Sequence, residues 1–225
     1  MKLTIFAATG GIGRHLLEQA VASGHDVTAV VRDPRPLTGR AGRFDVITAD
    51  LAAPDADLLA SAVEGRDAVL SGLGPRRPKA DAGITSHGTR AIVAAMQATG
   101  ARRLVVVSAS PIGTVPSPDR PHPPKHDPGD GFFMRHLGSP LARTMFRAHY
   151  ADLALMEDIL RRSDLEWTVS RPPRLTDKPL SGAYRTAIGR NPRGGVLVSR
   201  ADVAHHMLRV IDQPETARRT VGIAG

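Results

Sequence analysis

The 225-residue chain contains no cysteine, which excludes a disulfide framework and a thiolate metal site and leaves any redox chemistry to a bound cofactor. Its net charge of +8 comes from 30 lysines and arginines, mostly arginine, scattered through every segment, whereas nucleic-acid-binding domains concentrate their cations on one face. A hydrophobic content of 41%, with no leader-like segment and no apolar run of about 18 residues, predicts a single cytoplasmic domain that neither spans a membrane nor binds nucleic acid.

Residues 1–31 predict a strand, a glycine-rich turn, a helix and a second strand. Lys2 to Ala8 is a short, mostly apolar run, and Ile12 to Ser23 has apolar residues at helical spacing. Gly24 ends this helix, and Asp26 to Val31 is a second apolar strand. A βαβ unit of about 30 residues is typical of a right-handed crossover between parallel strands.

The rest of the chain alternates predicted strands with predicted helices, which favours a parallel sheet flanked by helices. The further strands are Asp45 to Thr48, Ala68 to Ser71, Arg103 to Val107 and Trp167 to Ser170. The further helices are Ala91 to Thr99, Tyr150 to Arg162, and a last helix that Ser199 caps and that reaches Asp212. The predicted fold is a single doubly wound Rossmann-type α/β domain over residues 1–225.

A proline-rich insertion at about residues 111–138 follows the fifth predicted strand. Its prolines lack the backbone N–H that helices and sheets need, so most of it is expected to be irregular. Phe132, Phe133 and Met134 near its end either cover a bound ligand or dock the loop onto the core. The sequence leaves these two roles open.

The glycine-rich turn is the first candidate site. Gly10 and Gly13 follow a strand and open a helix, where the backbone can approach a pyrophosphate. Ala7 replaces the usual first glycine, so the strict G-x-G-x-x-G pattern is absent, but the strand and helix around it favour dinucleotide binding over an ordinary turn. Gly10 and Gly13 are therefore expected to contact the cofactor.

The end of the second strand indicates which dinucleotide is bound. An acidic residue there binds the ribose hydroxyls of NAD, whereas an arginine accommodates the 2′-phosphate of NADP. Arg32 comes first, Arg35 follows closely and Arg14 opens the first helix, so we expect NADP. In the alternative, Arg32 is a solvated surface cation, Asp33 binds the ribose, and the cofactor is NAD.

Two more strand ends carry residues expected to line a cofactor site. Asp50 and Leu51 follow the third strand, where such pairs flank an adenine ring, and Leu73 and Gly74 follow the fourth, where small residues leave room for the cofactor. Taken singly, Asp50 could cap the next element and Gly74 could turn the chain. Their recurrence at the carboxyl ends of strands favours the binding role.

Hydroxyl groups follow the fifth strand. Ser108 and Ser110 are placed near the crevice where a nicotinamide ring would lie, and either could orient a substrate or be an ordinary polar strand end. No base and orienting group accompany them in sequence, so a serine hydrolase is not expected.

A metal site is not expected either. Adjacent histidines on a helix point in different directions, and no carboxylate-bearing metal signature accompanies the loop pair. The histidines considered are His122 and His126 in the loop and His205 and His206 on the last helix.

Several segments together resemble atypical short-chain dehydrogenase/reductase proteins of the NmrA-like NAD(P)-binding family, and within it the biliverdin-IXβ reductase/flavin reductase group. The resemblance runs nearly end to end. The segments that carry it are Phe6 to Gly13, Val30 to Asp33, Gly88 to Met96, Pro172 to Tyr184 and Ser199 to Ala204.

The resemblance implies a reductase that passes hydride from NAD(P)H to a planar conjugated acceptor such as a flavin, quinone or tetrapyrrole. It also implies that Thr9, Gly11 and Ile12 contact the cofactor beside the glycines of the turn. Two departures from that group concern the substrate: Ala109 stands where its pattern has a serine, and Arg174 stands where it has a pocket histidine. The Tyr-x-x-x-Lys pair of the larger family is also missing, because Tyr150 is followed at that spacing by Ala154. Ordinary alcohol oxidation is therefore disfavoured.

Two functions remain open. In the first, an NADPH-dependent reductase uses Arg174 to hold an anionic group of the acceptor and Ser108 or Ser110 to position its ring. Tyr150 borders this substrate cavity, and the loop phenylalanines stack on the acceptor. In the second, the chain is a non-catalytic sensor that binds the dinucleotide and a protein partner, as the missing lysine suggests. Acceptor and oligomeric state are not determined by the sequence.

Overall fold

The computed structural model describes residues 1–39, 43–76, 81–130 and 146–225, and its main sheet has the order β3-β2-β1-β4-β5-β6-β10-β8. The strands are β1 (Lys2–Phe6), β2 (Asp26–Val31), β3 (Asp45–Thr48), β4 (Ala68–Ser71), β5 (Arg103–Val107), β6 (Glu166–Arg171), β8 (Arg185–Ile188) and β10 (Arg219–Ala224). All neighbours are parallel except β10 and β8. The order reverses between β1 and β4, where doubly wound folds bind their ligands, so the predicted Rossmann-type sheet is confirmed.

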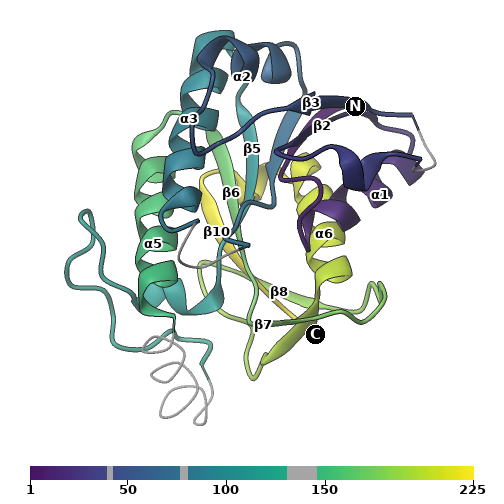
Figure 1. Ribbon diagram of the computed structural model, residues 1–225. Helices are drawn as coiled ribbons and strands as arrows, with labels where there is room; N and C mark the ends of the chain where they lie inside the picture. Colours follow the sequence, from purple (N-terminus) through teal and green to yellow (C-terminus); the bar gives the residue numbers. More distant parts are fainter. Residues whose placement is uncertain (40–42, 77–80, 131–145) are drawn as a thin grey trace.

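Helices cover both faces of the sheet (Figure 1). On one face lie α1 (Gly13–Ala22) and α6 (Arg200–Arg209), and on the other lie α2 (Ala56–Val63), α3 (Ile84–Thr99) and α5 (Arg147–Arg162). Strand β1 serves both layers by period-2 alternation, because Leu3 and Ile5 pack under α1 and α6 while Phe6 packs under α2, α3 and α5. No helix in the described part of the chain is long and apolar enough to cross a membrane.

Helix α3 begins seven residues before the predicted start at Ala91. The predicted start lies after Gly88, and glycine is unfavourable inside a helix. A Cβ atom on Gly88 would lie 2.6 Å from Leu73 Cδ2 and 3.3 Å from Leu51 Cβ. This glycine therefore lies inside a helix because the helix packs closely on the ends of β3 and β4.

The elements that sequence analysis missed are short or polar. Helix α2 and strands β8 and β10 belong to this group, and a second small sheet pairs β7 (Arg174–Thr176) with β9 (Leu197–Ser199). Helix α2 and strand β10 do bury apolar residues, but they are only eight and six residues long, and β8 is four residues long and mostly exposed.

The described part of the proline-rich insertion is docked onto the fold. Residues 110–115 are buried, and η2 (Ser110–Thr114) forms a 3₁₀ helix. Farther along, Asp127 Oδ1 accepts hydrogen bonds from the backbone N–H groups of Gly129 and Asn191, at 2.8 and 2.9 Å. Docking therefore holds for this half, whereas Phe132, Phe133 and Met134 lie outside the described residues.

A buried histidine couples this fold to pH. His206, on the buried face of α6, is 3% exposed, and its Nδ1 lies 3.0 Å from Ser170 Oγ. Its Nε2 has no hydrogen-bond partner among the described residues. Burial, followed by the charge of Arg209, lowers the pKa of His206 from 6.5 to about 4.

Between pH 6.5 and pH 4 the unfolded chain therefore binds a proton at His206 that the folded chain does not. We expect the free energy of unfolding to fall by roughly 3 kcal/mol from this group as the pH drops through that window. Urea unfolding of the wild-type protein and His206→Gln measures it, and the variant should show the shallower pH slope. His205→Gln is the control, and an equally reduced slope there would contradict the assignment.

Candidate functional site

The glycine-rich turn packs backbone against backbone. Gly10 N donates to Ala7 O at 2.8 Å, and a Cβ on Gly13 would lie only 2.0 Å from that same carbonyl oxygen. A Cβ on Gly72, just after β4, would lie 3.1 Å from Gly13 N. Ala7 itself has a left-handed φ of 57°, a conformation that favours glycine. The turn thus retains the expected glycine geometry although alanine occupies its first position.

A pocket opens beside this turn where β1, β2, β3 and β4 end, and we call it the strand-end pocket. The space between its walls is about 540 Å³ when the open mouth is included. Its lining residues are Ala7, Thr9, Val30, Arg32, Ala49, Asp50, Leu51, Leu73, Gly74, Arg76, Asp81 and Ile84.

This lining includes six of the ten predicted cofactor residues: Thr9, Arg32, Asp50, Leu51, Leu73 and Gly74. The other four, Gly10, Gly11, Ile12 and Gly13, form the adjacent turn and the start of α1. Asp50 has a local role as well, because its Oδ1 accepts a hydrogen bond from Ala52 N at 3.0 Å. The geometry can receive a dinucleotide, since the turn has no room for side chains at Gly10 or Gly13 and the pocket continues from it.

The arginines expected around a 2′-phosphate are separated in the structure. Arg32 lines the pocket, but Arg35 points its guanidinium at Asp33 and is 88% exposed. The side-chain and backbone hydrogen bonds from Arg35 lower the pKa of Asp33 to about 2. Arg14 lies beside Asp177 instead, with 4.0 Å between Nη2 and Oδ1. One of the three predicted cations therefore faces the pocket, and Asp33 is already bound by Arg35.

Two charged residues of the pocket were missed. Arg76 Nη2 donates to Thr9 Oγ1 at 2.6 Å, and the Arg76 backbone N donates to Asp81 Oδ2 at 2.9 Å. Asp81 also pairs with Arg32, with 3.3 Å between Oδ1 and Nη1. Arg76 follows Gly74 by two residues at the carboxyl end of β4, and this position was the available signal.

The four predicted catalytic residues lie on different elements. Ser108 and Ser110 follow β5, and their backbone N–H groups donate to Ser170 O and Pro172 O at 2.8 Å. Tyr150 is half-buried in the first turn of α5, and burial raises its pKa. Arg174 is exposed on β7. Within the described residues, no hydrogen bond joins Tyr150 or Arg174 to either serine.

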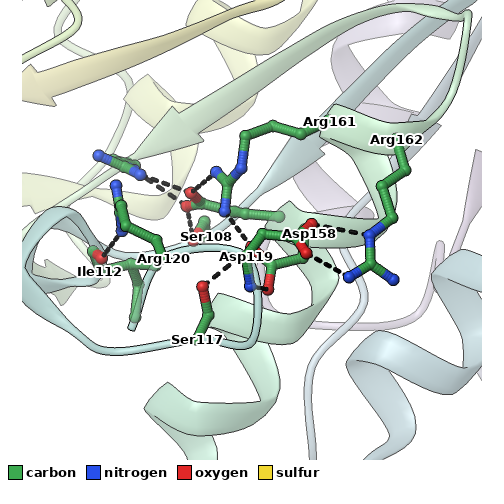
Figure 2. Close-up of polar contacts among 10 residues, drawn as sticks. Ser108, Ile112, Ser117, Asp119, Arg120, Asp158, Arg161 and Arg162 are labelled. Carbon is green, nitrogen blue, oxygen red and sulfur yellow. Dashed lines mark hydrogen bonds and ion pairs between the residues drawn. The ribbon is translucent and has the colours of Figure 1, made fainter. Parts of the chain in front are cut away.

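Ser108 belongs to a buried charge network that was not predicted (Figure 2). Its Oγ donates to Glu157 Oε1 at 2.8 Å, and the same carboxylate receives two hydrogen bonds from Arg171. Burial alone would raise the pKa of Glu157, but Arg171, Ser108 and Arg161 together hold it below its ordinary value. Ser108 thus has a buried partner from α5.

The network extends to the proline-rich insertion. Asp158, fully buried, pairs with Arg161 and accepts hydrogen bonds from Ser117 Oγ at 2.9 Å and Asp119 N at 3.1 Å. At the surface, Arg162 pairs with Asp119. Figure 2 shows both arginines reaching from α5 towards these carboxylates. These hydrogen bonds and ion pairs therefore hold the described part of the insertion against α5, the helix that has Tyr150 in its first turn.

His205 and His206 on α6 are engaged in side-chain hydrogen bonds. Tyr184 OH lies 2.8 Å from His205 Nδ1, and His206 is bonded to Ser170. No group of three or more potential metal ligands gathers in the described ranges.

Comparison with known proteins gives a family match and shared folds. The model of a family described as NAD(P)H-binding matches residues 7–214. The UPF0659 protein C216.03 of Schizosaccharomyces pombe is 29% identical over 215 residues, covering 92% of this chain and 83% of the relative.

Two solved structures share the fold. The oxidoreductase ylbE from Lactococcus lactis has a TM-score of 0.78 at 14% identity, covering 100% of this chain and 91% of that one. ChuY, named an anaerobillin reductase, from Escherichia coli O157:H7 has a TM-score of 0.74 at 22% identity, covering 100% and 97%. At these identities they show a common fold.

The buried network gives a stability prediction. Glu157→Ala leaves Arg171 as a buried cation without its main counter-charge, so we expect the free energy of unfolding to fall by about 3–5 kcal/mol in urea titrations. Asp119→Ala is the matched control, and its loss should be small because solvent screens its exposed pair with Arg162. Equal losses in the two variants would show that the Glu157 contacts do not support the fold.

Proposed function

The chain belongs to the NAD(P)H-binding family, and we propose that it is an NADPH-dependent reductase that acts on a planar conjugated acceptor. The observation that carries the proposal is the strand-end pocket with Arg32 in its wall, continuous with a turn that excludes side chains. Two proteins that share the fold, ylbE, named an oxidoreductase, and ChuY, named an anaerobillin reductase, support an oxidoreductase reaction.

The residues of the pocket suit the adenosine half of the dinucleotide. Leu51 and Leu73 offer apolar surface to an adenine ring, and Arg32 and Arg76 offer guanidinium groups to phosphate oxygens. Asp33, the ribose ligand in the NAD alternative, is bound by Arg35 and lies outside the pocket lining. These contacts favour NADP over NAD.

Bound NADPH would supply the hydride, and the chain would position the acceptor. Ser110 lies at the end of β5, where a nicotinamide ring lies in folds of this type. Arg174 is exposed on β7, so its guanidinium is accessible and can bind an anionic group of the acceptor, such as a carboxylate. Ser108 would act through Glu157 and Arg171 as a positioning residue. Tyr150 would border the acceptor.

The sensor alternative has one observation in its favour. Ala154, which replaces the family lysine, is 1% exposed and packed in the core, so α5 offers no cation to Tyr150 at that position. A sensor would bind NADP⁺ and NADPH without turnover.

The choice between NADP and NAD can be tested by substitution of Arg32. Arg32→Ala removes a charged hydrogen-bond donor to the 2′-phosphate, so we expect the Kd for NADPH to rise ~10–100-fold and that for NADH to change little. Fluorescence titration measures both. Arg219→Gln, at an exposed arginine of β10 outside the pocket lining, serves as the control and should leave both affinities unchanged. Equal weakening of NADPH and NADH by Arg32→Ala would refute the 2′-phosphate assignment.

The proposed reductase activity can be tested by NADPH oxidation. The protein should oxidise NADPH, followed by its absorbance, with at least one acceptor from a panel of FMN, FAD, quinones and biliverdin. Arg174→Gln should raise KM most for anionic acceptors, because it removes the cation proposed to bind them. Tight NADPH binding without oxidation by any acceptor would favour the sensor.

A further inference from the structure

A second arginine lies against the glycine-rich turn from the far end of the chain. Arg200 is the first residue of α6, directly after the N-cap Ser199. A Cβ on Gly11 would lie 2.9 Å from Arg200 Nε and 3.1 Å from its Cδ. The guanidinium stem therefore occupies the space that a side chain at position 11 would fill.

The packing of α6 on α1 fixes this position. Gln19 Nε2 on α1 donates to Ala201 O on α6 at 3.0 Å, and both helices share one apolar core. From this anchor the Arg200 side chain reaches back to the start of α1. Its side chain is 29% exposed, so it is held by the fold and still reachable from solvent.

The only described carboxylate within salt-bridge distance of this guanidinium is exposed. Arg200 Nη1 lies 2.8 Å from Asp177 Oδ1, and Arg14 Nη2 lies 4.0 Å from the same oxygen. Asp177 is 71% exposed, unlike the buried carboxylates that hold Arg171 and Arg161. An exposed pair of this kind is weak and can be exchanged for a stronger anion.

We propose that Arg200 binds the pyrophosphate of the dinucleotide, with Asp177 as the counter-ion that the pyrophosphate replaces. The inference rests on the proposed function, because it assumes that a dinucleotide occupies the glycine-rich turn. Arginine matches two phosphate oxygens through parallel N–H bonds, and Gly11 leaves it room to do so. Arg32 and Arg200 then recognise different phosphates of one ligand.

Ligand fragments separate these two roles. ADP-ribose contains the pyrophosphate without a 2′-phosphate, whereas adenosine 2′-monophosphate contains the 2′-phosphate alone. Arg200→Gln should raise the Kd for ADP-ribose and NADP⁺ ~10-fold or more and leave adenosine 2′-monophosphate unchanged. Arg32→Ala should show the opposite selectivity. Isothermal titration calorimetry measures the Kd of each protein variant for each of these ligands.

Three further variants complete the experiment. Arg200→Lys, which retains the charge, should recover part of the affinity for ADP-ribose, and Asp177→Asn should tighten it ~2-fold or more by removing the competing carboxylate. Arg219→Gln, at an exposed arginine on β10, is the matched control and should bind as the wild type does. Urea unfolding of each variant separates binding effects from loss of fold.

Three outcomes overturn the inference. If the wild-type protein binds NADP⁺ and the folded Arg200→Gln variant binds ADP-ribose as tightly as the wild type, the role of Arg200 is refuted. The proposed function is unaffected by that result. Equal weakening of both fragments would assign Arg200 a structural role instead. A wild-type protein that binds no dinucleotide at all would refute the proposed function as well.

Discussion

The architecture depends on one close contact between backbones. The carbonyl of Ala7 lies where a Cβ on Gly13 would be, and Gly72 lies against the same turn from β4. This contact sets α1 directly on the ends of β1 and β4, at the reversal of strand order. Every other part of the site is placed relative to it: the strand-end pocket opens beside the turn, and Arg200 lies on its outer side.

A second constraint operates on the opposite side of the sheet. The carboxylates of Glu157 and Asp158 leave α5 side by side and bind groups from β5, β6 and the insertion. Buried carboxylates are costly unless fully paired, so this cluster selects one arrangement of those four segments. It thereby fixes the backbone around Ser110, where the acceptor of the proposed reaction would lie.

The strands and the first turn could be predicted from the sequence because their signals are local. Apolar runs and a glycine spacing identified β1 to β6, and six strand-end residues did line the pocket. The family resemblance was confirmed at the level of NAD(P)H binding. The missed elements are short: β8 is four residues long and mostly exposed, and α2 and β10 are eight and six residues long, so each offers few positions for a periodic pattern.

Polar partners could not be predicted, since folding brings them together from distant segments. Ser108 meets Glu157 from 49 positions away, and Asp81 meets Arg32 across the same interval. Arg35 was expected to face a phosphate, but Asp33, two residues before it, provides a nearer partner. In an arginine-rich chain, the position of an arginine in the sequence is thus a poor guide to the anion that it binds. Only the tertiary structure shows which arginines face the pocket and which pair with a carboxylate.

The pairing of α1 with α6 also bears on how the chain is made. The apolar layer under these helices joins residues of β1, β2 and α1 to Val198, Val203, Met207 and Ile223. During synthesis from the N-terminus, the first βαβ unit therefore emerges long before α6, the helix that covers its apolar face. Until Arg200 and the rest of α6 have emerged, that face is open to wrong partners, and the glycine-rich turn lacks the arginine that lies upon it.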